Sequence, residues 1–294
     1  MQSANELPPC AKGFIPLDGG RVWIAPEYEP IFKTNGLLTF AAIMGYCGGQ
    51  RFKKNAYREV WRIELSGCVP LFLKKHFRTR LWDRLEPWLL WQKPETSAYH
   101  ELVAISHLQT IGIDTMKPVA FGEQVGRTGE TECFSLTEAI QGIKLEHLLE
   151  QQPQRWQEDF AFRQALTAKL AGIARTMHAH HLHHQDFYLG HIMLSWETPN
   201  QFRLWLIDLQ RMHKRRWFWD RWWIKDLSQL SYGCPPQLVT QADRLRFWYG
   251  YQQRNYLTAQ DRKWFAWIAA RLKKTERHDL RKVQRNNAGR KNED

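Results

Sequence analysis

The sequence lacks paired cysteines. Its 294 residues include only five cysteines, an odd number, and no two of them are spaced as C-x-x-C. Zinc fingers and disulfide-rich secreted domains both depend on such pairs. Neither class fits this chain, and the scattered thiols are typical of a protein kept in a reducing compartment.

Long apolar segments are absent as well. The N-terminus, MQSANELPPCAKG, has neither the basic start nor the apolar stretch of a secretory signal. The longest apolar run, LLTFAAIMGYC, is too short to span a bilayer. We therefore expect a protein that is cytoplasmic or peripheral to a membrane.

Acidic residues are too few to balance the basic ones. The chain has 30 Asp and Glu against 42 Lys and Arg, which gives a formal net charge of +12. Such an excess favours a polyanionic partner, namely nucleic acid, an anionic membrane surface or a phosphorylated substrate. The length is sufficient for one large domain or for two lobes with a sizeable core.

What is present is a hydrophobic period that changes along the chain from that of strands to that of helices. Residues 1–36 are rich in Pro and Gly and are interpreted as an extension with a short strand at RVWIAP. The predicted strands are LLTFAAIMGY (37–46), AYREVWRIEL (56–65), LFLKKH (71–76), KPVAFGE (117–123), TECFSLTEAI (131–140), HIMLSW (191–196) and FRLWLIDL (202–209). Helices are predicted over residues 96–112, from Trp156 to Met177, and through most of the remainder.

This order predicts an α+β, two-lobed, protein-kinase-like fold. The predicted parts are a 1–36 extension, a 37–138 N-lobe of antiparallel sheet with one helix, and a mainly helical 139–294 C-lobe with a basic tail. Phosphoryl transfer needs a lysine on the nucleotide phosphates, carboxylates on magnesium and a base for the acceptor hydroxyl. The chain carries these side chains in the order that such a fold requires.

Four residues are the first candidates for this chemistry. Strand alternation places Lys74 opposite to Leu73 and Lys75, and Glu101 lies in a helix from which it could pair with Lys74. Asp186 follows the long helix in a loop, where it could accept a proton, and Asp208 ends an apolar strand. Each also has an ordinary explanation, since strands often end in lysines, surface helices carry Glu and buried Asp residues occur at strand ends.

The segment HAHHLHHQDFYLGHIML, residues 178–194, admits two interpretations. Five histidines fall within seven positions, and His180 with His184 has the i, i+4 spacing of many zinc ligand pairs. No Glu lies between these two as a general base, and no cysteine pair accompanies them. The alternative is a catalytic loop in which His184 is structural while the other four histidines cap and solvate the preceding helix. On this second interpretation we expect no stoichiometric zinc.

HHQDFYLGHIML, followed downstream by LIDLQR, resembles the Kdo/WaaP-type lipopolysaccharide core kinases, whose pattern is similar to H-R-D-C-Y-x-x-H and I-D-L-H-R. The resemblance extends to FLKKH, HELVAISHL, GIDTMKPVAFGE, LTEAI and RWWIKDLSQL, and so covers roughly residues 37–235. It implies a kinase that uses ATP and Mg²⁺ to phosphorylate a sugar, most often heptose, of the lipopolysaccharide inner core.

Roles for particular residues follow from this resemblance. Asp186 is implied as the catalytic base and Asp208 as the magnesium carboxylate. Lys74, paired with Glu101, is implied to bind the phosphates. His191 stands where typical protein kinases have a metal-binding Asn.

The resemblance also bears on residues outside this set. Glu138 belongs to the hinge-like LTEAI and is implied in nucleotide binding, and Asp226 matches the aspartate that braces the catalytic loop. No full G-x-G-x-x-G is present, so Gly48, with the glycines around it, is a substitute for that loop. Gln185 replaces the family's Arg before the catalytic Asp, and DLQ replaces its D-L-H.

Partners are expected to be anionic. The lipopolysaccharide core is the implied acceptor, and RMHKRRWFWDRWWIKD combines aromatic and basic residues that suit it, unless its Trp residues are simply core. The basic C-terminal segment RLKKTERHDLRKVQRNNAGRK suits the inner face of the inner membrane, and no nucleic acid is expected. The alternatives are a kinase for Kdo, for another sugar or for a protein, and a non-catalytic binder of anionic glycolipid.

Overall fold

The computed structural model describes residues 7–77, 96–126, 131–198, 201–215 and 219–290. The chain divides into two compact units, the first formed by residues 1–141 with 205–211 and the second by residues 142–204 with 212–294. The division falls close to the predicted boundary between the lobes, but the short segment that carries Asp208 belongs to the first unit.

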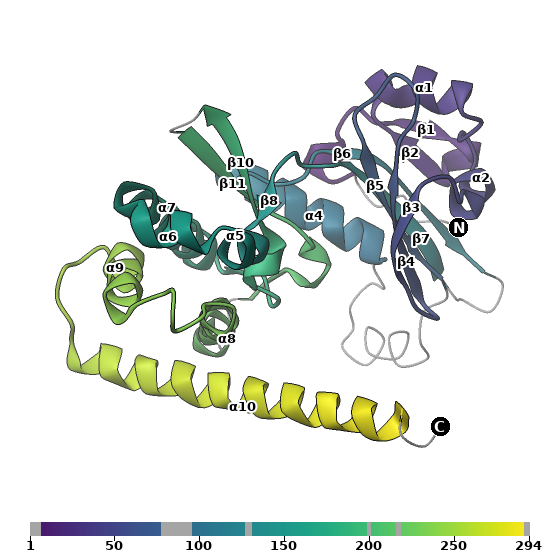
Figure 1. Ribbon diagram of the computed structural model, residues 1–294. Coiled ribbons are helices and arrows are strands. Elements are labelled where there is room, and N and C mark those ends of the chain that lie inside the picture. Colours follow the sequence, from purple (N-terminus) through teal and green to yellow (C-terminus); the bar gives the residue numbers. More distant parts are fainter. Residues whose placement is uncertain (1–6, 78–95, 127–130, 199–200, 216–218, 291–294) are drawn as a thin grey trace. The chain divides into compact units, whose positions relative to one another are not determined.

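A seven-stranded antiparallel sheet forms the body of the first unit (Figure 1). Its strands lie in the order β1-β2-β6-β7-β5-β4-β3, and neighbouring strands are hydrogen-bonded. Their bounds are β1 Ile15–Leu17, β2 Val22–Ile24, β3 Gln50–Lys54, β4 Arg58–Ile63, β5 Leu71–His76, β6 Pro118–Val125 and β7 Thr131–Glu138. The central strands β4 to β7 match the predicted strands.

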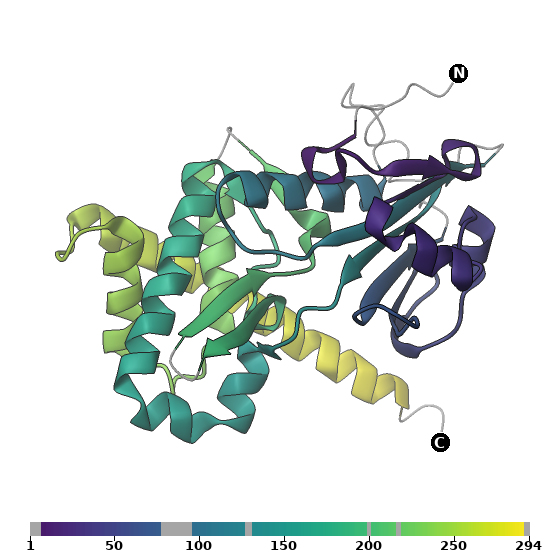
Figure 2. The same ribbon diagram turned by 90° about the horizontal axis from the view of Figure 1, so that it is seen from above.

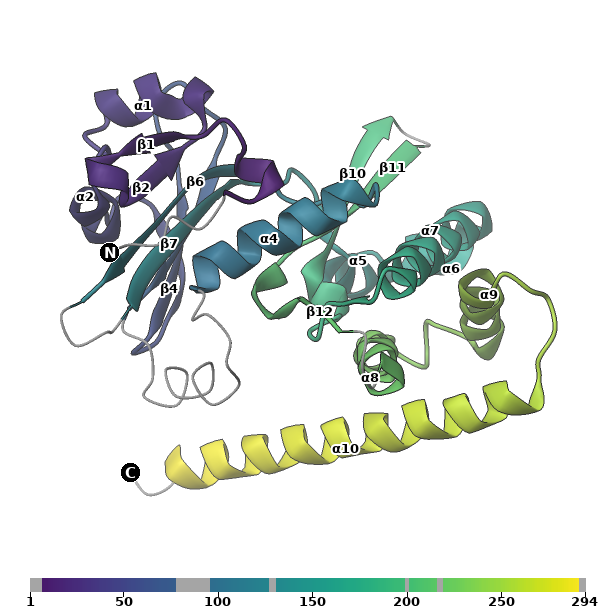
Figure 3. The same cartoon turned by 180° about the vertical axis from the view of Figure 1, so that it is seen from behind.

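The two faces of this sheet are covered by different helices (Figure 3). The short helices α1 Glu29–Thr34 and α2 Phe40–Gly45 contribute Phe32 and Ile43 to a core that also contains Leu73 of β5. The longer helix α4, Ser97–Thr110, packs on the other face, where Leu102 joins a small cluster with Phe121. Because side chains alternate along β5, a residue next to Leu73 faces α4.

The prediction of a strand over residues 37–46 is wrong, because this segment contains α2. The Thr39 side chain accepts a hydrogen bond from the Ala42 N–H at the helix N-terminus, and Phe40 and Ile43, one turn apart, are the buried residues. The strand that precedes β4 is instead β3. All five of its residues are exposed, so it carries no hydrophobic alternation to reveal it.

Residues 1–36, predicted as an extension, contribute to the sheet. β1 pairs with β2, and β2 pairs with β6, with Trp23 opposite Phe121. The 3-10 turn η1 Pro9–Ala11 precedes β1, η2 Asp18–Gly20 connects β1 to β2, and η3 Pro26–Tyr28 connects β2 to α1. The strand predicted at RVWIAP is β2.

The second unit is mainly helical, as predicted. Its elements are β8 Ile143–Lys144, α5 Leu145–Gln151, α6 Pro153–Glu158, α7 Phe160–Ala179, β9 Leu182–His183, η4 Leu189–His191, β10 Ile192–Thr198, β11 Gln201–Leu206, β12 His213–Lys214, α8 Trp219–Tyr232, α9 Gln241–Gln252 and α10 Ala259–Arg290. The β10–β11 hairpin lies beside α7 (Figure 2), where Phe162 packs on Trp196 and Phe202. β11 runs into the first unit and leads to η5, Leu209–Arg211, which packs against α4.

These elements confirm the α+β, two-lobed, kinase-like fold class, with an antiparallel sheet in one unit and helices in the other. Within the residues described, no helix is long and apolar enough to cross a membrane. Residues 216–218 of the aromatic and basic segment lie outside the described residues, as do residues 291–294 of the basic tail.

Candidate functional site

Lys74 is positioned by the alternation of β5. Its Nζ makes an ion pair with the Glu101 carboxylate of α4, and its side chain is only 8% exposed. Lys75 points to the other face of the sheet, where its Nζ donates to the Tyr46 carbonyl at 2.5 Å. The two adjacent lysines therefore have different surroundings, and Lys74 is the one beside Glu101.

Glu101 is fully buried, so its charge needs partners. One carboxylate oxygen accepts from Lys74, and the other accepts from the Ser135 hydroxyl of β7 at 2.7 Å. Ser135 is itself 1% exposed. This serine fixes the orientation of the carboxylate, and it was not predicted, because a serine within an apolar strand gives no signal in the sequence.

Asp208 completes a cluster of charges in the first unit. Its Oδ1 lies 3.7 Å from Lys74 Nζ and 3.4 Å from Arg58 Nη2, while 32% of its side chain remains exposed. Its φ of +57° lies in the left-handed region, which costs a non-glycine residue about 1–2 kcal/mol. The Lys74 cluster, defined as Lys74, Glu101, Arg58 and Asp208, thus presents a partly exposed carboxylate beside two cations.

His76 and Gln210 connect the end of β5 to the turn that follows Asp208. The Gln210 amide donates to His76 Nε2 at 3.0 Å, which requires that ring nitrogen to be deprotonated. Burial, followed by the positive charge of Arg58, lowers the pKa of His76 to about 4. The glutamine that replaces the resembled family's histidine after Asp208 therefore has a structural partner.

Glu138 and Gly48, both predicted to bind the nucleotide, have surroundings of their own in the first unit. The Glu138 carboxylate accepts from the Tyr28 hydroxyl and pairs with Lys117 Nζ at 2.8 Å, and this hydrogen bond raises the pKa of Lys117. Gly48 precedes β3. It therefore lies outside the turn between β3 and β4, which residues 55–57 form. Gly49, with φ +140°, is required because a Cβ there would lie 2.4 Å from the Arg62 carbonyl oxygen.

In the second unit, Asp186 lies in a loop held by buried side chains of α8. The Asp226 carboxylate, which is completely buried, accepts the backbone N–H of His184 at 2.9 Å and that of Gln185 at 2.7 Å. Gln185 has φ +65°, so the residue before Asp186 occupies a strained conformation that these bonds stabilise. The bracing role expected of Asp226 is confirmed by this geometry.

Gln229 holds the same loop from the other side of Asp186. Its Oε1 accepts the Phe187 N–H at 3.1 Å, and its Nε2 donates to the Gln185 carbonyl at 2.8 Å. The two residues flanking Asp186 are therefore tied to a single amide that is 6% exposed. Gln229 was not predicted, and its position one helical turn after Asp226 is the only signal of its role in the sequence.

His191 also contacts this loop. Its Nδ1 lies 2.7 Å from the Asp186 carbonyl oxygen, so that nitrogen carries the proton and donates. The ring thereby restrains the backbone of Asp186. The prediction that His191 orients a neighbouring group is compatible with this contact.

The prediction that four histidines of the tract merely cap and solvate a helix is wrong for two of them. His178 is 2% exposed and His183 is completely buried, as is His184. Burial, followed by the charge of His178, lowers the pKa of His183 to about 4. His180 fits the prediction better, because it is exposed and its Nδ1 contacts the Thr176 carbonyl of the last helical turn at 2.9 Å.

The aromatic and basic segment separates into core and surface. Trp223 is 2% exposed and packs against Trp248 and Trp264, so it belongs to the core. Trp222 is only partly buried and is surrounded by cations, with Arg215, Arg221 and Lys225 at 5.7, 5.3 and 5.9 Å from its ring centroid. We call these four residues the Trp222 patch.

The sheet with α4, the buried Lys–Glu pair and a loop aspartate braced by a buried aspartate together define a protein-kinase-like phosphotransferase. Sequence comparison shows to which family within this class the chain belongs. Residues 49–251 match the lipopolysaccharide kinase (Kdo/WaaP) family. The chain belongs to this family.

Individual relatives agree with this assignment. The lipopolysaccharide core heptose(I) kinase WaaP of Escherichia coli K12 is 31% identical over 206 residues, which cover 68% of this chain and 76% of that protein. The enzyme of the same name from Pseudomonas aeruginosa is 31% identical over 228 residues, covering 75% and 82%. A solved structure of WaaP in complex with acyl carrier protein has a TM-score of 0.65 at 28% identity, covering 84% of this chain and 96% of that one.

Proposed function

We propose that this kinase transfers the γ-phosphoryl group of ATP to a hydroxyl of a heptose in the lipopolysaccharide inner core. The observation that carries the proposal is the Lys74 cluster, since a buried Lys–Glu pair beside a partly exposed aspartate is what nucleotide phosphates require. The heptose comes from the relatives, which are named heptose(I) kinases.

Each charged residue has a distinct task in this reaction. Lys74, held by Glu101, neutralises charge on the nucleotide phosphates, and Arg58 adds a second cation beside Asp208. The Asp208 carboxylate, with an oxygen-donor chemistry that fits Mg²⁺, is the proposed ligand of that ion. Bound there, Mg²⁺ would supply charge neutralisation on the phosphate oxygens. Glu138 and Gly48 stay as proposed contributors to nucleotide binding, through backbone rather than through the Glu138 carboxylate, which is already paired.

Asp186 acts on the acceptor. Its carboxylate takes the proton of the sugar hydroxyl while the hydroxyl oxygen forms a bond to the γ-phosphorus and the bond from that phosphorus to the ADP oxygen breaks. The products are a sugar phosphate, ADP and a proton on Asp186. His191 restrains the Asp186 backbone during this step through its bond to the carbonyl.

The Trp222 patch is the proposed binding surface for the anionic core. Sugar rings can stack on the partly exposed indole, and the three cations around it suit phosphates and carboxylates. Arg271 is a further cation near Arg221, because burial and then the positive charge of Arg221 lower the pKa of Arg271. The net charge of +12 supports a further proposal, that the enzyme works at the anionic inner face of the inner membrane.

An acyl carrier protein is a proposed partner, because the solved relative is a complex with one. The second unit has a cavity of about 280 Å³ that could accept an alkyl chain. Its lining is mostly apolar and includes Leu149, Leu170, Leu230, Phe247 and Ile268. Acylated carrier protein should therefore co-elute with the kinase in size-exclusion chromatography, whereas unacylated carrier protein should bind more weakly.

The test of the catalytic proposal is transfer of labelled phosphate from ATP to purified lipopolysaccharide cores of defined structure. A core that ends in heptose should be labelled, and a core that ends in Kdo should not. Labelling of the Kdo core alone would replace heptose by Kdo as the acceptor. Absence of label on every core, with ATP still bound, would favour a non-catalytic binder of glycolipid.

A further inference from the structure

His183 is a buried histidine whose ring nitrogens make no hydrogen bond of regular geometry among the described residues, although the nearby Arg215 backbone acts to raise its pKa. Its exposure is 0%, and neither Nδ1 nor Nε2 is within regular hydrogen-bonding geometry of a described group. A buried polar group left unsatisfied costs about 1–3 kcal/mol, so such a group in a folded protein calls for an explanation. A ring nitrogen with a lone pair is also a metal ligand.

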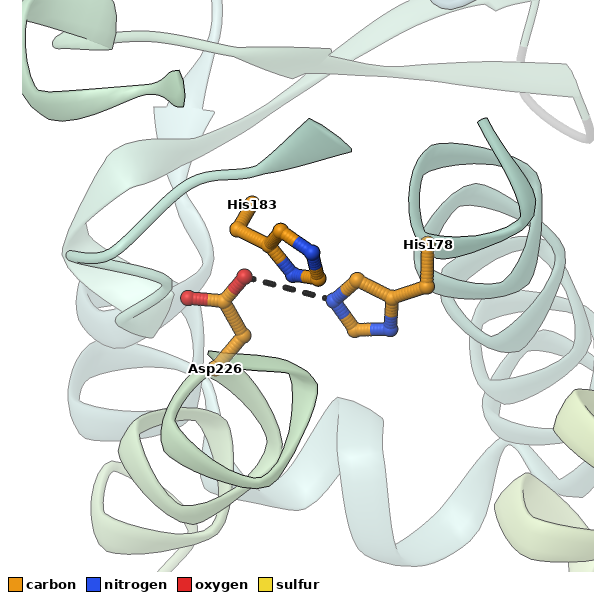
Figure 4. Close-up of side chains that lie close together, drawn as sticks. All are labelled: His178, His183 and Asp226. Atoms are coloured by element: carbon orange, nitrogen blue, oxygen red, sulfur yellow. Dashed lines mark hydrogen bonds and ion pairs between the residues drawn. The ribbon is translucent and has the colours of Figure 1, made fainter. Parts of the chain in front are cut away.

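Two further ligands converge on His183 from different elements (Figure 4). His178 comes from the last turn of α7, His183 from β9 and Asp226 from α8. One ligand atom of each residue lies within 4.8 Å of those of the other two, and all three side chains are buried. His178 and His183 stack with their ring centroids 5.5 Å apart.

The spacing suits a small divalent ion. Zn²⁺ binds imidazole nitrogen and carboxylate oxygen at about 2.0–2.2 Å in tetrahedral geometry, which puts neighbouring ligand atoms roughly 3.3–3.5 Å apart. His178 Nε2 and Asp226 Oδ2 are already 3.2 Å apart. The His183 nitrogen needs to approach these two atoms by a rotation of its ring. Two nitrogens and one oxygen favour zinc or a similar transition metal over Mg²⁺ or Ca²⁺, which prefer oxygen alone.

Groups around the three ligands hold them in orientation. His178 Nδ1 is 2.9 Å from the Tyr251 hydroxyl, a contact that leaves Nε2 to face Asp226. The Asp226 carboxylate accepts the backbone N–H groups of His184 and Gln185. Outer hydrogen bonds of this kind fix the tautomer of a ligating histidine and the direction of a ligating carboxylate.

We propose that His178, His183 and Asp226 form a structural site for a divalent transition metal, with Zn²⁺ as the best match. The ion links α7, β9 and α8 directly beneath the loop that carries Asp186. This ligand set differs from the i, i+4 pair of His180 and His184, and it reverses the sequence-based prediction that the chain holds no zinc.

The experiment uses the full chain with any histidine tag removed. The protein is stripped with a chelator, dialysed against zinc, freed of excess metal and analysed by elemental mass spectrometry and thermal unfolding. We expect about one zinc ion per chain and a higher unfolding temperature with zinc than without. His183→Asn should lose more than about tenfold in zinc affinity, while the matched control His180→Gln, from the exposed part of the tract, should bind as the wild type does.

Cobalt gives a readout that needs no variant. Co²⁺ in the wild-type site should show the intense visible absorption bands of a four-coordinate ion, not the weak bands of six-coordinate cobalt. Two results would overturn the proposal. One is a wild-type chain that holds no zinc after reconstitution. The other is a His183→Asn variant that binds zinc as tightly as the wild type, since this would place the metal on the exposed histidines.

Discussion

The two halves of the proposed catalytic site are held in place by different forces. In the first unit, the Lys74 cluster is organised by opposite charges, with Glu101 between Lys74 and the Ser135 hydroxyl. In the second unit, the Asp186 loop is organised by neutral backbone groups that bond to Asp226 and Gln229. Ion pairing therefore positions the Lys74 cluster, and hydrogen bonds to the backbone position the Asp186 loop.

This difference determines what a substitution does. Removing one partner of a buried ion pair leaves an uncompensated charge and also removes charge that the phosphates need. Removing a brace from the loop leaves the charge of Asp186 intact but frees the strained backbone of Gln185 before it. Variants of the first unit should chiefly change nucleotide binding, whereas variants of the loop should chiefly change turnover.

The largest effect is expected for Asp186→Ala. Turnover should fall by roughly a hundredfold or more, because a positioned base contributes about that much, while ATP affinity and the fold are retained. Steady-state kinetics, ATP titration and circular dichroism measure these three quantities. Glu150→Ala, an exposed carboxylate of the same unit, is the control and should behave as the wild type. Near-normal turnover of Asp186→Ala would remove the base from the mechanism.

Lys74→Met tests the charge-organised half. We expect a loss of more than about tenfold in kcat/KM with a clear rise in the KM for ATP, since a cation on the phosphates is lost. Its matched control is Lys75→Met, whose Nζ contacts the Tyr46 carbonyl on the opposite face of the sheet. If Lys75→Met were the damaging change and Lys74→Met silent, the assignment of Lys74 to the nucleotide would be wrong.

Asp208→Asn distinguishes the role of the proposed magnesium ligand from that of the proposed base, Asp186. The variant should lose activity because it weakens the proposed magnesium ligand, and raised magnesium should restore part of it. The same increase should do nothing for Asp186→Ala. Titrating magnesium against the turnover of both variants checks this difference, and equal rescue of the two would argue against separate roles.

Much of this arrangement could be predicted from the sequence, and the reasons are physical. Lys74 and Glu101 could be placed because strand and helix periods are regular, so LFLKKH and HELVAISHL fix which side chains face each other. β3 could not be placed, because a fully exposed strand shows no alternation. α2 was mistaken for a strand because a short apolar run has no clear period.

The residues that hold the Asp186 loop could not be predicted from local sequence patterns either. Asp226 was found only through the family resemblance, and Gln229 and Ser135 were not found at all. Each acts through contacts with residues at least 34 positions away in sequence. A buried histidine such as His183 has the same letter as an exposed one such as His180, and only the fold separates them.

A smaller effect is expected for Gln229→Leu, which tests the geometry-organised half. The Phe187 N–H and the Gln185 carbonyl lose their partner, at about 1–3 kcal/mol for each buried group left unsatisfied. Turnover should fall several-fold while the KM for ATP stays unchanged. Gln229→Glu keeps the acceptor for Phe187 but turns a carboxylate oxygen towards the Gln185 carbonyl, so it should not restore wild-type turnover. A rise in the KM for ATP without a change in kcat would contradict a positioning role.

The last effect is one on stability rather than on activity, and it returns to the first unit. Burial lowers the pKa of His76 to about 4, below the ordinary value of about 6.5 that the unfolded chain has. The unfolded state therefore binds more protons between these two values. The stability that depends on neutral His76 is complete above pH 6.5 and is lost as the pH falls towards 4, at up to about 1.4 kcal/mol per pH unit.

His76→Gln should flatten this part of the dependence, because the replacement does not titrate. Free energies of unfolding, measured with denaturant at several pH values across this window, should fall less steeply for the variant than for the wild type. The exposed His180→Gln serves as control and should keep the wild-type slope. Equal slopes for all three proteins would mean that the pKa of His76 does not change on folding, which would contradict its burial and its contact with the Gln210 amide.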